Sequence, residues 1–382
     1  MSPPQVQPWS FGSWGGILAW TGAATMAELG AAFPGEEGVQ QYLQYIYGET
    51  FGFLAAWTWV VAVVPENCHG KLGQFRAAIA VTVVAGLGVV CYHLAGWDKP
   101  NPQESQDQLM RAWLSAPNTV ALDGREIEWQ KLHGWESIGL YSAALYGAQW
   151  AYSGWDKAIY VSAELPALAR QLPLAIKTAV PIAILSFIAV NIAYYILLPW
   201  RVVSTTDSVA VTSFSHLLGS TLGAIAAGLI CLVVAGPLLG RSFGAGRIVV
   251  AAANSNWLAD FLARVGSVSG RSTSTAYAPI NAILFSTAWS IVYILFGNFR
   301  GLATFSGLSA CIFFFLTMVG AIILRVREPE LPRPYKPPIC VPVVFTLVSG
   351  FGVARGAAFA PVQAMVLIGL WLVGLGLYSA RR

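Results

Sequence analysis

The sequence predicts an all-α, polytopic membrane protein that forms one domain over residues 1–382. Of its 382 residues, 56% are hydrophobic and only 10% are charged, whereas about a quarter of the residues in soluble proteins carry a charge. The mean hydropathy is +0.61. Apolar runs of the length that crosses a bilayer, about 20 residues, recur along the chain. A soluble protein with one buried core is therefore excluded.

The apolar runs predict about ten membrane segments. A tenth, weaker segment at 42–64 has an apolar core of only 14 residues, which predicts a tilted span or a re-entrant piece. The polar stretch 96–133 predicts an extramembrane loop. The nine clear spans are 11–33, 73–95, 137–164 (interrupted), 174–199, 217–239, 276–298, 301–324, 338–354 and 361–379.

Basic residues assign the two sides of the membrane. From residue 157 onward, thirteen lysines and arginines fall on one side of the predicted spans and three on the other. Cytoplasmic loops carry the excess of basic residues, so the first side is predicted to be cytoplasmic. It includes 241–275, a cytoplasmic loop with a surface helix. Residues 1–70 hold no lysine or arginine, so one early segment is predicted not to be a simple crossing.

Several functional classes find no support in the sequence. The five cysteines and four histidines are scattered without a metal-ligand spacing, so no metal and no cofactor are expected. There is no phosphate-binding loop, paired carboxylate or nucleophile–base motif. We therefore expect neither an ATP-driven pump nor an enzyme.

The interrupted span 137–164 contains the best candidate site. At bilayer depth it places Ser153 and Gly154, which permit a break in the helix, followed by Asp156 and Lys157. Non-helical backbone within a membrane is tolerated only where it lines a cavity or is buried in protein. Transporters use such breaks, because half-helix ends and unwound carbonyls bind the charges of a substrate.

Plainer interpretations of the same stretch stay open. Gly154 is also typical of close helix packing. Asp156 and Lys157 also fit a cytoplasmic interface, with the lysine side chain extended toward water. Trp155 also fits an interfacial anchor. In the site interpretation, Trp150 and Tyr152 cover an apolar substrate side chain.

Five blocks of sequence, in order along the chain, resemble the L-type amino acid transporter family, in particular its fungal methionine permease-like members, within the amino acid–polyamine–organocation superfamily. Together they cover nearly the whole chain. The blocks are AELGAAFPGEEGVQQYLQYIYG (27–48), ALYGAQWAYSGWDKAIYVSAEL (144–165), RQLPLAIKTAVPIAILSFIAVNIAYY (170–195), GRIVVAAANSNWLADFLARVG (246–266) and RVREPELPRPYKPPICVPVVF (325–345).

The resemblance implies an inverted-repeat transporter fold of five plus five plus two helices. The sequence begins where the family's second helix begins, and after Val64-Pro65 it continues at the start of the fifth. The first helix and the third/fourth-helix region therefore have no counterpart here. The resemblance implies an incomplete fold of about ten membrane segments.

The resemblance also assigns roles within the broken stretch. Trp150 matches an aromatic gate, and Asp156 matches a position that hydrogen-bonds near the substrate. Ile159 departs from the family, which often has asparagine there, and the partner half-site on the first helix is missing. The predicted substrate-binding residues are Trp150, Ala151, Tyr152, Ser153, Gly154 and Asp156.

These observations predict a transporter of neutral L-amino acids that works by alternating access, in the plasma membrane and without a glycoprotein heavy-chain partner. The alternative is a truncated, non-transporting membrane remnant or a receptor-like sensor. Two further polar residues are predicted to have structural roles. We expect Glu28 to form a structural or gating ion pair with an arginine between 241 and 271, and Asn191 to bond to a neighbouring helix. The sequence names neither the amino acid nor the coupling mode.

Overall fold

The computed structural model describes most of the N-terminal helices and the C-terminal half of the chain. Of the predicted spans, 73–95 and most of 137–164 lie outside the described residues. The structure describes residues 8–33, 38–63, 118–120, 126–128, 152, 154–156, 159, 168–198, 202–203, 206, 209–219, 221, 223–225, 227–229, 245–263, 266–267, 277–278, 280–296 and 299–381.

The described part of the chain is all-α apart from two short antiparallel strand pairs. β1 (Asn118–Val120) pairs with β2 (Glu126–Glu128) within the predicted extramembrane loop, and β3 (Gly266–Ser267) pairs with β4 (Tyr277–Ala278). The helices with named bounds are α1 (Pro8–Ala32), α2 (Val39–Tyr47), α3 (Glu49–Thr58), the π-helix η1 (Trp59–Val63), α8 (Leu168–Leu197), α10 (Val209–Leu218), the 3-10 helix η3 (Asp260–Leu262), α12 (Ile280–Phe296), α13 (Phe299–Arg327), α14 (Cys340–Phe359) and α15 (Pro361–Arg381).

Four helices in the described part of the chain are long and apolar enough to cross a membrane. They are Leu168–Tyr194, Phe305–Arg327, Cys340–Ala358 and Pro361–Ala380. Each coincides with a span predicted from the sequence, which confirms the polytopic all-α class. A shorter apolar helix, Ile280–Val292, lies within a fifth predicted span.

The weak segment 42–64 is a pair of short helices rather than one continuous span. α2 and α3 meet at Gly48, whose φ of 99° lies in the left-handed region that glycine adopts without strain. α2 has 9 residues, and α3 has 10 residues and continues directly into the 5 residues of η1. Each described piece is shorter than the length of about 20 residues that crosses a bilayer. The break explains why this segment gives a weak apolar signal.

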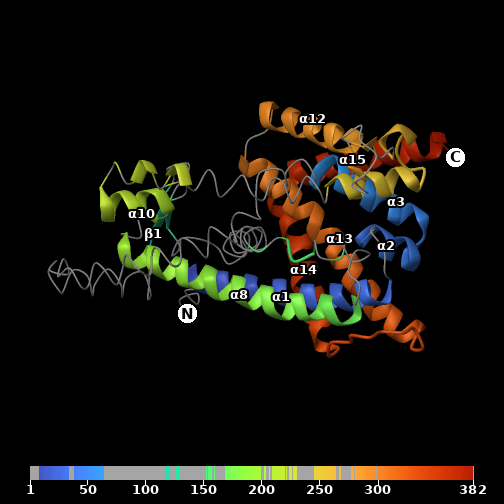
Figure 1. The fold of residues 1–382 in the computed structure, drawn as a ribbon, viewed down its shortest axis with the longest axis horizontal. Coiled ribbons are helices and arrows are strands. Elements are labelled where there is room, and N and C mark those ends of the chain that lie inside the picture. Colours follow the sequence, from blue (N-terminus) through green and yellow to red (C-terminus); the bar gives the residue numbers. More distant parts are fainter. Residues whose placement is uncertain are drawn as a thin grey trace.

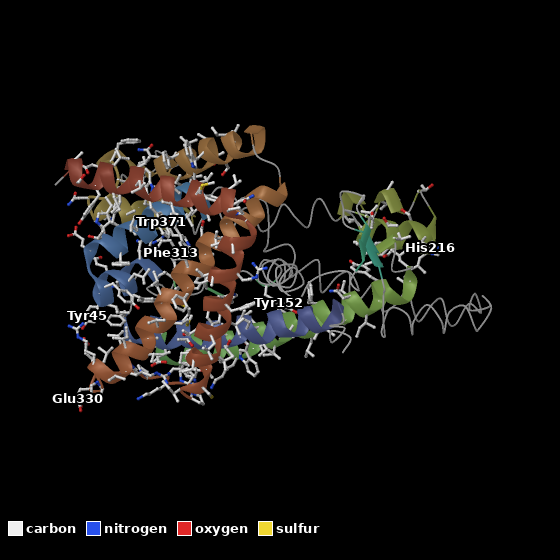
Figure 2. All side chains as sticks on the ribbon, turned by 180° about the vertical axis from the view of Figure 1, so that it is seen from behind. Tyr45, Tyr152, His216, Phe313, Glu330 and Trp371 are labelled. Carbon is white, nitrogen blue, oxygen red and sulfur yellow. The ribbon has the colours of Figure 1, made fainter. Side chains whose placement is uncertain are left out.

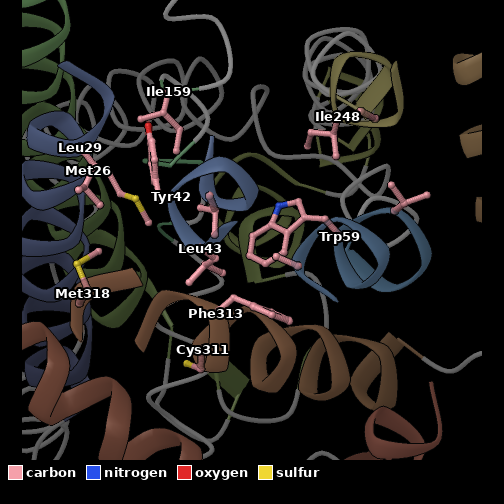
Figure 3. Packing of buried hydrophobic residues seen from close by; sticks show 14 of the residues in the cluster. Met26, Leu29, Tyr42, Leu43, Trp59, Ile159, Ile248, Cys311, Phe313 and Met318 are labelled. Atoms are coloured by element: carbon pink, nitrogen blue, oxygen red, sulfur yellow. The ribbon is translucent and has the colours of Figure 1, made fainter. Parts of the chain in front are cut away.

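Helix α13 lies at the centre of the bundle, as Figure 1 shows, with α1 and α8 side by side along one flank and α12 and α15 at the opposite flank. Its inward face supplies Leu308, Phe313 and Met318 to the main buried cluster. α1 contributes Met26 and Leu29 to the same cluster (Figure 3). The bundle is therefore organised around α13.

Polar bonds fix the helices where the apolar environment of a membrane gives little preference. The indole of Trp289 on α12 donates to the carbonyl of Val61 in η1 at 2.8 Å. Between α3 and α15, Trp57 donates to the Leu370 carbonyl and Trp371 donates to the Thr58 hydroxyl. These bonds set the register between helices.

The predicted surface helix at 246–266 is shorter in the structure, and most of its residues are buried. Residues 245–254 are helical, and Ile248 and Val249 belong to the main buried cluster. Asn254 is exposed. The helix is thus buried over most of its surface, and its cytoplasmic position stays a prediction.

Candidate functional site

The predicted break in the span 137–164 is present at Gly154. This residue has φ +119°, a conformation that residues with side chains rarely adopt. Residues 154–156 form a turn, and the Ile159 amide donates to the Asp156 carbonyl at 3.4 Å. The chain therefore departs from helical geometry where the sequence predicts it.

Tyr152 is buried at this break. Its side chain, labelled in Figure 2, is 9% exposed. Its ring lies 5.0 Å from the ring of Phe187 on α8. Among the described residues, its phenolic oxygen has no hydrogen-bond partner. An unsatisfied buried hydroxyl costs about 1–3 kcal/mol, so a polar group of a ligand would be favoured beside it.

Asp156 places a carboxyl group in the same buried turn. It is only 2% exposed. A carboxylate accepts hydrogen bonds and attracts positive charge, and the ammonium group of an amino acid offers both. Asp156 therefore has the chemistry to bind a cationic group inside the bundle.

Trp155 packs into the bundle, which disagrees with its interpretation as an interfacial anchor. Its ring lies 4.8 Å from that of Phe314 on α13 and 5.7 Å from that of Phe345 on α14. Sequence reasoning missed this role, because both partners are far away along the chain. The available sequence signal for this packing role was a large aromatic residue directly after Gly154.

The structure brings Tyr152, Gly154 and Asp156 together around one turn. The three other predicted site residues, Trp150, Ala151 and Ser153, lie outside the described residues. Ile159, which departs from the family pattern, is completely buried in the main cluster with Tyr42. Its role is packing.

The ion pair predicted for Glu28 exists, but the predicted region of its partner was wrong. Arg325 donates to both carboxylate oxygens of Glu28, with Nε 2.9 Å from Oε1, and to the Pro337 carbonyl at 2.8 Å. Arg333 Nε lies 3.4 Å from the same Oε1. The arginines come from the end of α13 and the following loop, because that loop folds back onto the end of α1.

One basic residue, Lys177, and one aromatic residue, Tyr335, lie beside this ion cluster. The Lys177 amine lies 5.0 Å above the ring of Tyr335. Burial first, and then the Glu28 carboxylate, raise the pKa of Tyr335. Basic residues that the sequence assigns to one side of the membrane, on α8 and after α13, are therefore neighbours.

Among the described residues, Asn191 bonds within its own helix rather than to a neighbouring helix as predicted. Its side-chain amide donates to the Phe187 carbonyl one turn earlier on α8, at 2.8 Å. A polar side chain on a helix can donate to the carbonyl one turn earlier, and this local hydrogen bond competes with a bond to another helix. Within the described residues, no group of three or more His, Cys, Asp and Glu side chains is placed to hold a metal ion.

Comparison with known proteins shows the family of the chain. A model of the amino acid permease family matches residues 75–377. The b(0,+)-type amino acid transporter 1 of Mus musculus is 26% identical over 360 residues, which cover 88% of this chain and 72% of that protein. The large neutral amino acids transporter small subunit 2 of Rattus norvegicus is 26% identical over 389 residues, with 95% and 72% covered.

These findings confirm the resemblance to the L-type amino acid transporters. The fungal methionine permease-like subtype stays a prediction, as does the loss of the first helix and of the third/fourth-helix region. The family match spans most of the chain, including the broken stretch and α8 to α15. The protein is therefore a multi-pass membrane transporter of amino acids, not an enzyme, and it belongs to the amino acid permease family.

Proposed function

We propose that this permease moves neutral L-amino acids by alternating access, with the substrate bound at the broken segment 150–157. The observation that carries the proposal is the positive φ of Gly154 between the buried side chains of Tyr152 and Asp156. A turn of this kind exposes backbone groups inside a membrane bundle, where they require a partner.

The chemistry of the turn fits an amino acid zwitterion. The Asp156 carboxylate and unwound carbonyls accept hydrogen bonds from the ammonium group, while amide N–H groups at the half-helix end and the Tyr152 hydroxyl donate to the carboxylate. Both charges of the backbone of an amino acid are thereby compensated. The ring of Tyr152 also borders the space for the side chain of the substrate.

A neutral substrate side chain is favoured by the residues that pack around the turn. Those with described contacts are the aromatic residues Phe187, Phe314 and Phe345, with Tyr152 and Trp155 themselves. A charged side chain placed against these rings would lose its hydration without a charged partner, which is strongly unfavourable. One of the relatives is itself named a large neutral amino acids transporter subunit.

Alternating access requires that the helices around the site rearrange as bodies. The turn at residues 154–156, where Trp155 packs against the central helix α13, provides a point for such motion. We assign the protein to the plasma membrane. The expectation that it works without a heavy-chain partner stays a prediction.

The proposal is tested by uptake of radiolabelled L-methionine and L-leucine into liposomes that contain the purified protein. The wild type is expected to take up neutral amino acids above the level of protein-free liposomes. Asp156→Ala is expected to reduce uptake at least about tenfold, because a hydrogen bond to a charged group contributes about 1.5–3 kcal/mol.

Asp260→Ala is the matched control, because this carboxylate is exposed on η3. It is expected to leave uptake unchanged. Wild-type protein that binds neutral amino acids without uptake would support the sensor alternative instead. Uptake that survives Asp156→Ala unchanged would remove Asp156 from the site.

A further inference from the structure

Gly22 lies on α1 at a point where no side chain fits. A Cβ atom built on it would be 2.5 Å from Phe345 Cε2 and 2.8 Å from Trp155 Cη2. Non-bonded carbon atoms are at their optimal separation at about 3.5–4.0 Å. Any residue larger than glycine would therefore have to displace Phe345, Trp155 or both.

Trp155 is held from three helices at once. α1 meets its indole at Gly22, α13 packs against it through Phe314, and α14 packs against it through Phe345. Phe345 is itself only 1% exposed. An added methyl group on α1 would thus press on a ring that has packed neighbours on α13 and α14.

The backbone that carries Trp155 is the turn of the proposed substrate site. Gly154 precedes it with its positive φ, and the buried Asp156 follows it. A shift of the indole is transmitted to these two neighbours through the main chain. The position of the ring and the geometry of the turn are therefore linked.

We propose that Gly22 is a positioning residue for substrate binding: its missing side chain admits the Trp155 ring, and that ring fixes the turn at residues 154–156. This inference rests on the proposed function of the turn as the substrate site. It adds a residue from α1, which the sequence did not single out. Gly22 acts through Trp155 rather than by touching the substrate.

The test is the KM for amino acid uptake by Gly22→Ala in liposomes. We expect KM to rise about tenfold, equal to about 1.4 kcal/mol of lost binding, with the maximal rate per folded transporter within about threefold of wild type. A merely structural role would instead lower the amount of folded protein and leave KM unchanged. Phe345→Leu in the Gly22→Ala background is expected to restore KM to within about threefold, because it removes the closest obstructing atoms.

Two control variants separate this effect from general crowding. Gly16→Ala adds a Cβ 2.8 Å from Ile184 Cγ1, between α1 and α8, and is expected to leave KM unchanged. Gly369→Ala on α15 adds a Cβ that no heavy atom of the described residues approaches within 4 Å. It is expected to leave both KM and the amount of folded protein unchanged. If Gly22→Ala does not fold, Trp155→Phe carries the test, with the same rise in KM expected.

The inference is overturned if Gly22→Ala, or Trp155→Phe in its place, keeps the wild-type KM. It is also overturned if Gly16→Ala raises KM as much as Gly22→Ala does. The proposed function fails separately, if the wild type takes up no neutral amino acid. The KM comparison is then made with the amino acid that the wild type does transport.

Discussion

Helix α1 makes two contacts with neighbouring segments that differ in their physical basis. At Gly22 the contact depends on shape, since an aromatic ring occupies the place of a side chain. At Glu28, six residues later, it depends on charge, since two arginines bind one buried carboxylate. Lipid tails are as apolar as the helices, so close packing and polar bonds decide which helices associate. This helix uses both.

The difference separates stability from substrate binding. The Glu28 cluster joins α1 to the end of α13 and to the loop before α14, and it touches none of the described site residues. The Gly22 contact reaches the turn that carries Asp156. We therefore expect changes at Glu28 to affect folding, and changes at Gly22 to affect affinity for substrate.

The largest effect on stability is expected from Glu28→Ala. Removing one partner of a buried ion cluster leaves charges without compensation, at a cost of about 3–5 kcal/mol. The variant is measured by unfolding of the protein in detergent, and the fraction that stays folded is expected to keep the wild-type KM. Glu330→Ala, which removes an exposed carboxylate from the loop after α13 (labelled in Figure 2), is the control and is expected to change stability by less than about 0.5 kcal/mol. Equal losses for the two variants would contradict the charge contact.

A smaller effect is expected from Gly16→Ala, which crowds α1 against α8 away from the site. Overpacking of this kind costs about 1–3 kcal/mol, and Ile184→Ala in the same chain is expected to recover most of the loss. The unfolding measurement is the same as for Glu28→Ala. A failure of Ile184→Ala to recover stability would show that the α1–α8 contact differs from the one described.

The smallest effect is expected from Trp371→Phe, which removes one neutral hydrogen bond. The Trp371 indole donates to Thr58 at 2.9 Å, and its ring lies 5.8 Å from that of Phe313 (Figure 2). Phenylalanine keeps a ring but not the donor. Hydrogen bonds between membrane helices average about 0.6 kcal/mol, so the free energy of unfolding is expected to fall by an amount of that order. Leu372→Ala, on an exposed part of α15, is the control. If Trp371→Phe lowers the free energy of unfolding by more than about 3 kcal/mol, the neutral bond stabilises the bundle as much as the charged cluster, which would contradict the account.

Sequence reasoning predicted the helices that are continuous and bounded by polar residues. The spans from α12 to α15 agree with the structure within a few residues, because each apolar run ends at turns or basic residues. The break at Gly154 was predicted for the same reason, since polar residues at bilayer depth interrupt the pattern. These features are local, and local composition determines them.

Contacts between distant segments could not be predicted in this way. Glu28 was expected to bind an arginine, but several arginines lie on the predicted cytoplasmic side, and only the folded loop after α13 selects Arg325 and Arg333. Gly22 carries no signal of its own among the glycines of the apolar spans. Its role depends on Trp155, more than a hundred residues away in the chain.

The most direct test of the substrate site is a cryo-electron microscopy structure of the protein in a lipid nanodisc with saturating L-methionine or L-leucine. We predict density for the amino acid at the turn of residues 152–156, with its ammonium group beside Asp156 and its carboxylate at the Tyr152 hydroxyl. Density for the amino acid at another place in the bundle, with an unbroken helix through Gly154, would contradict the account.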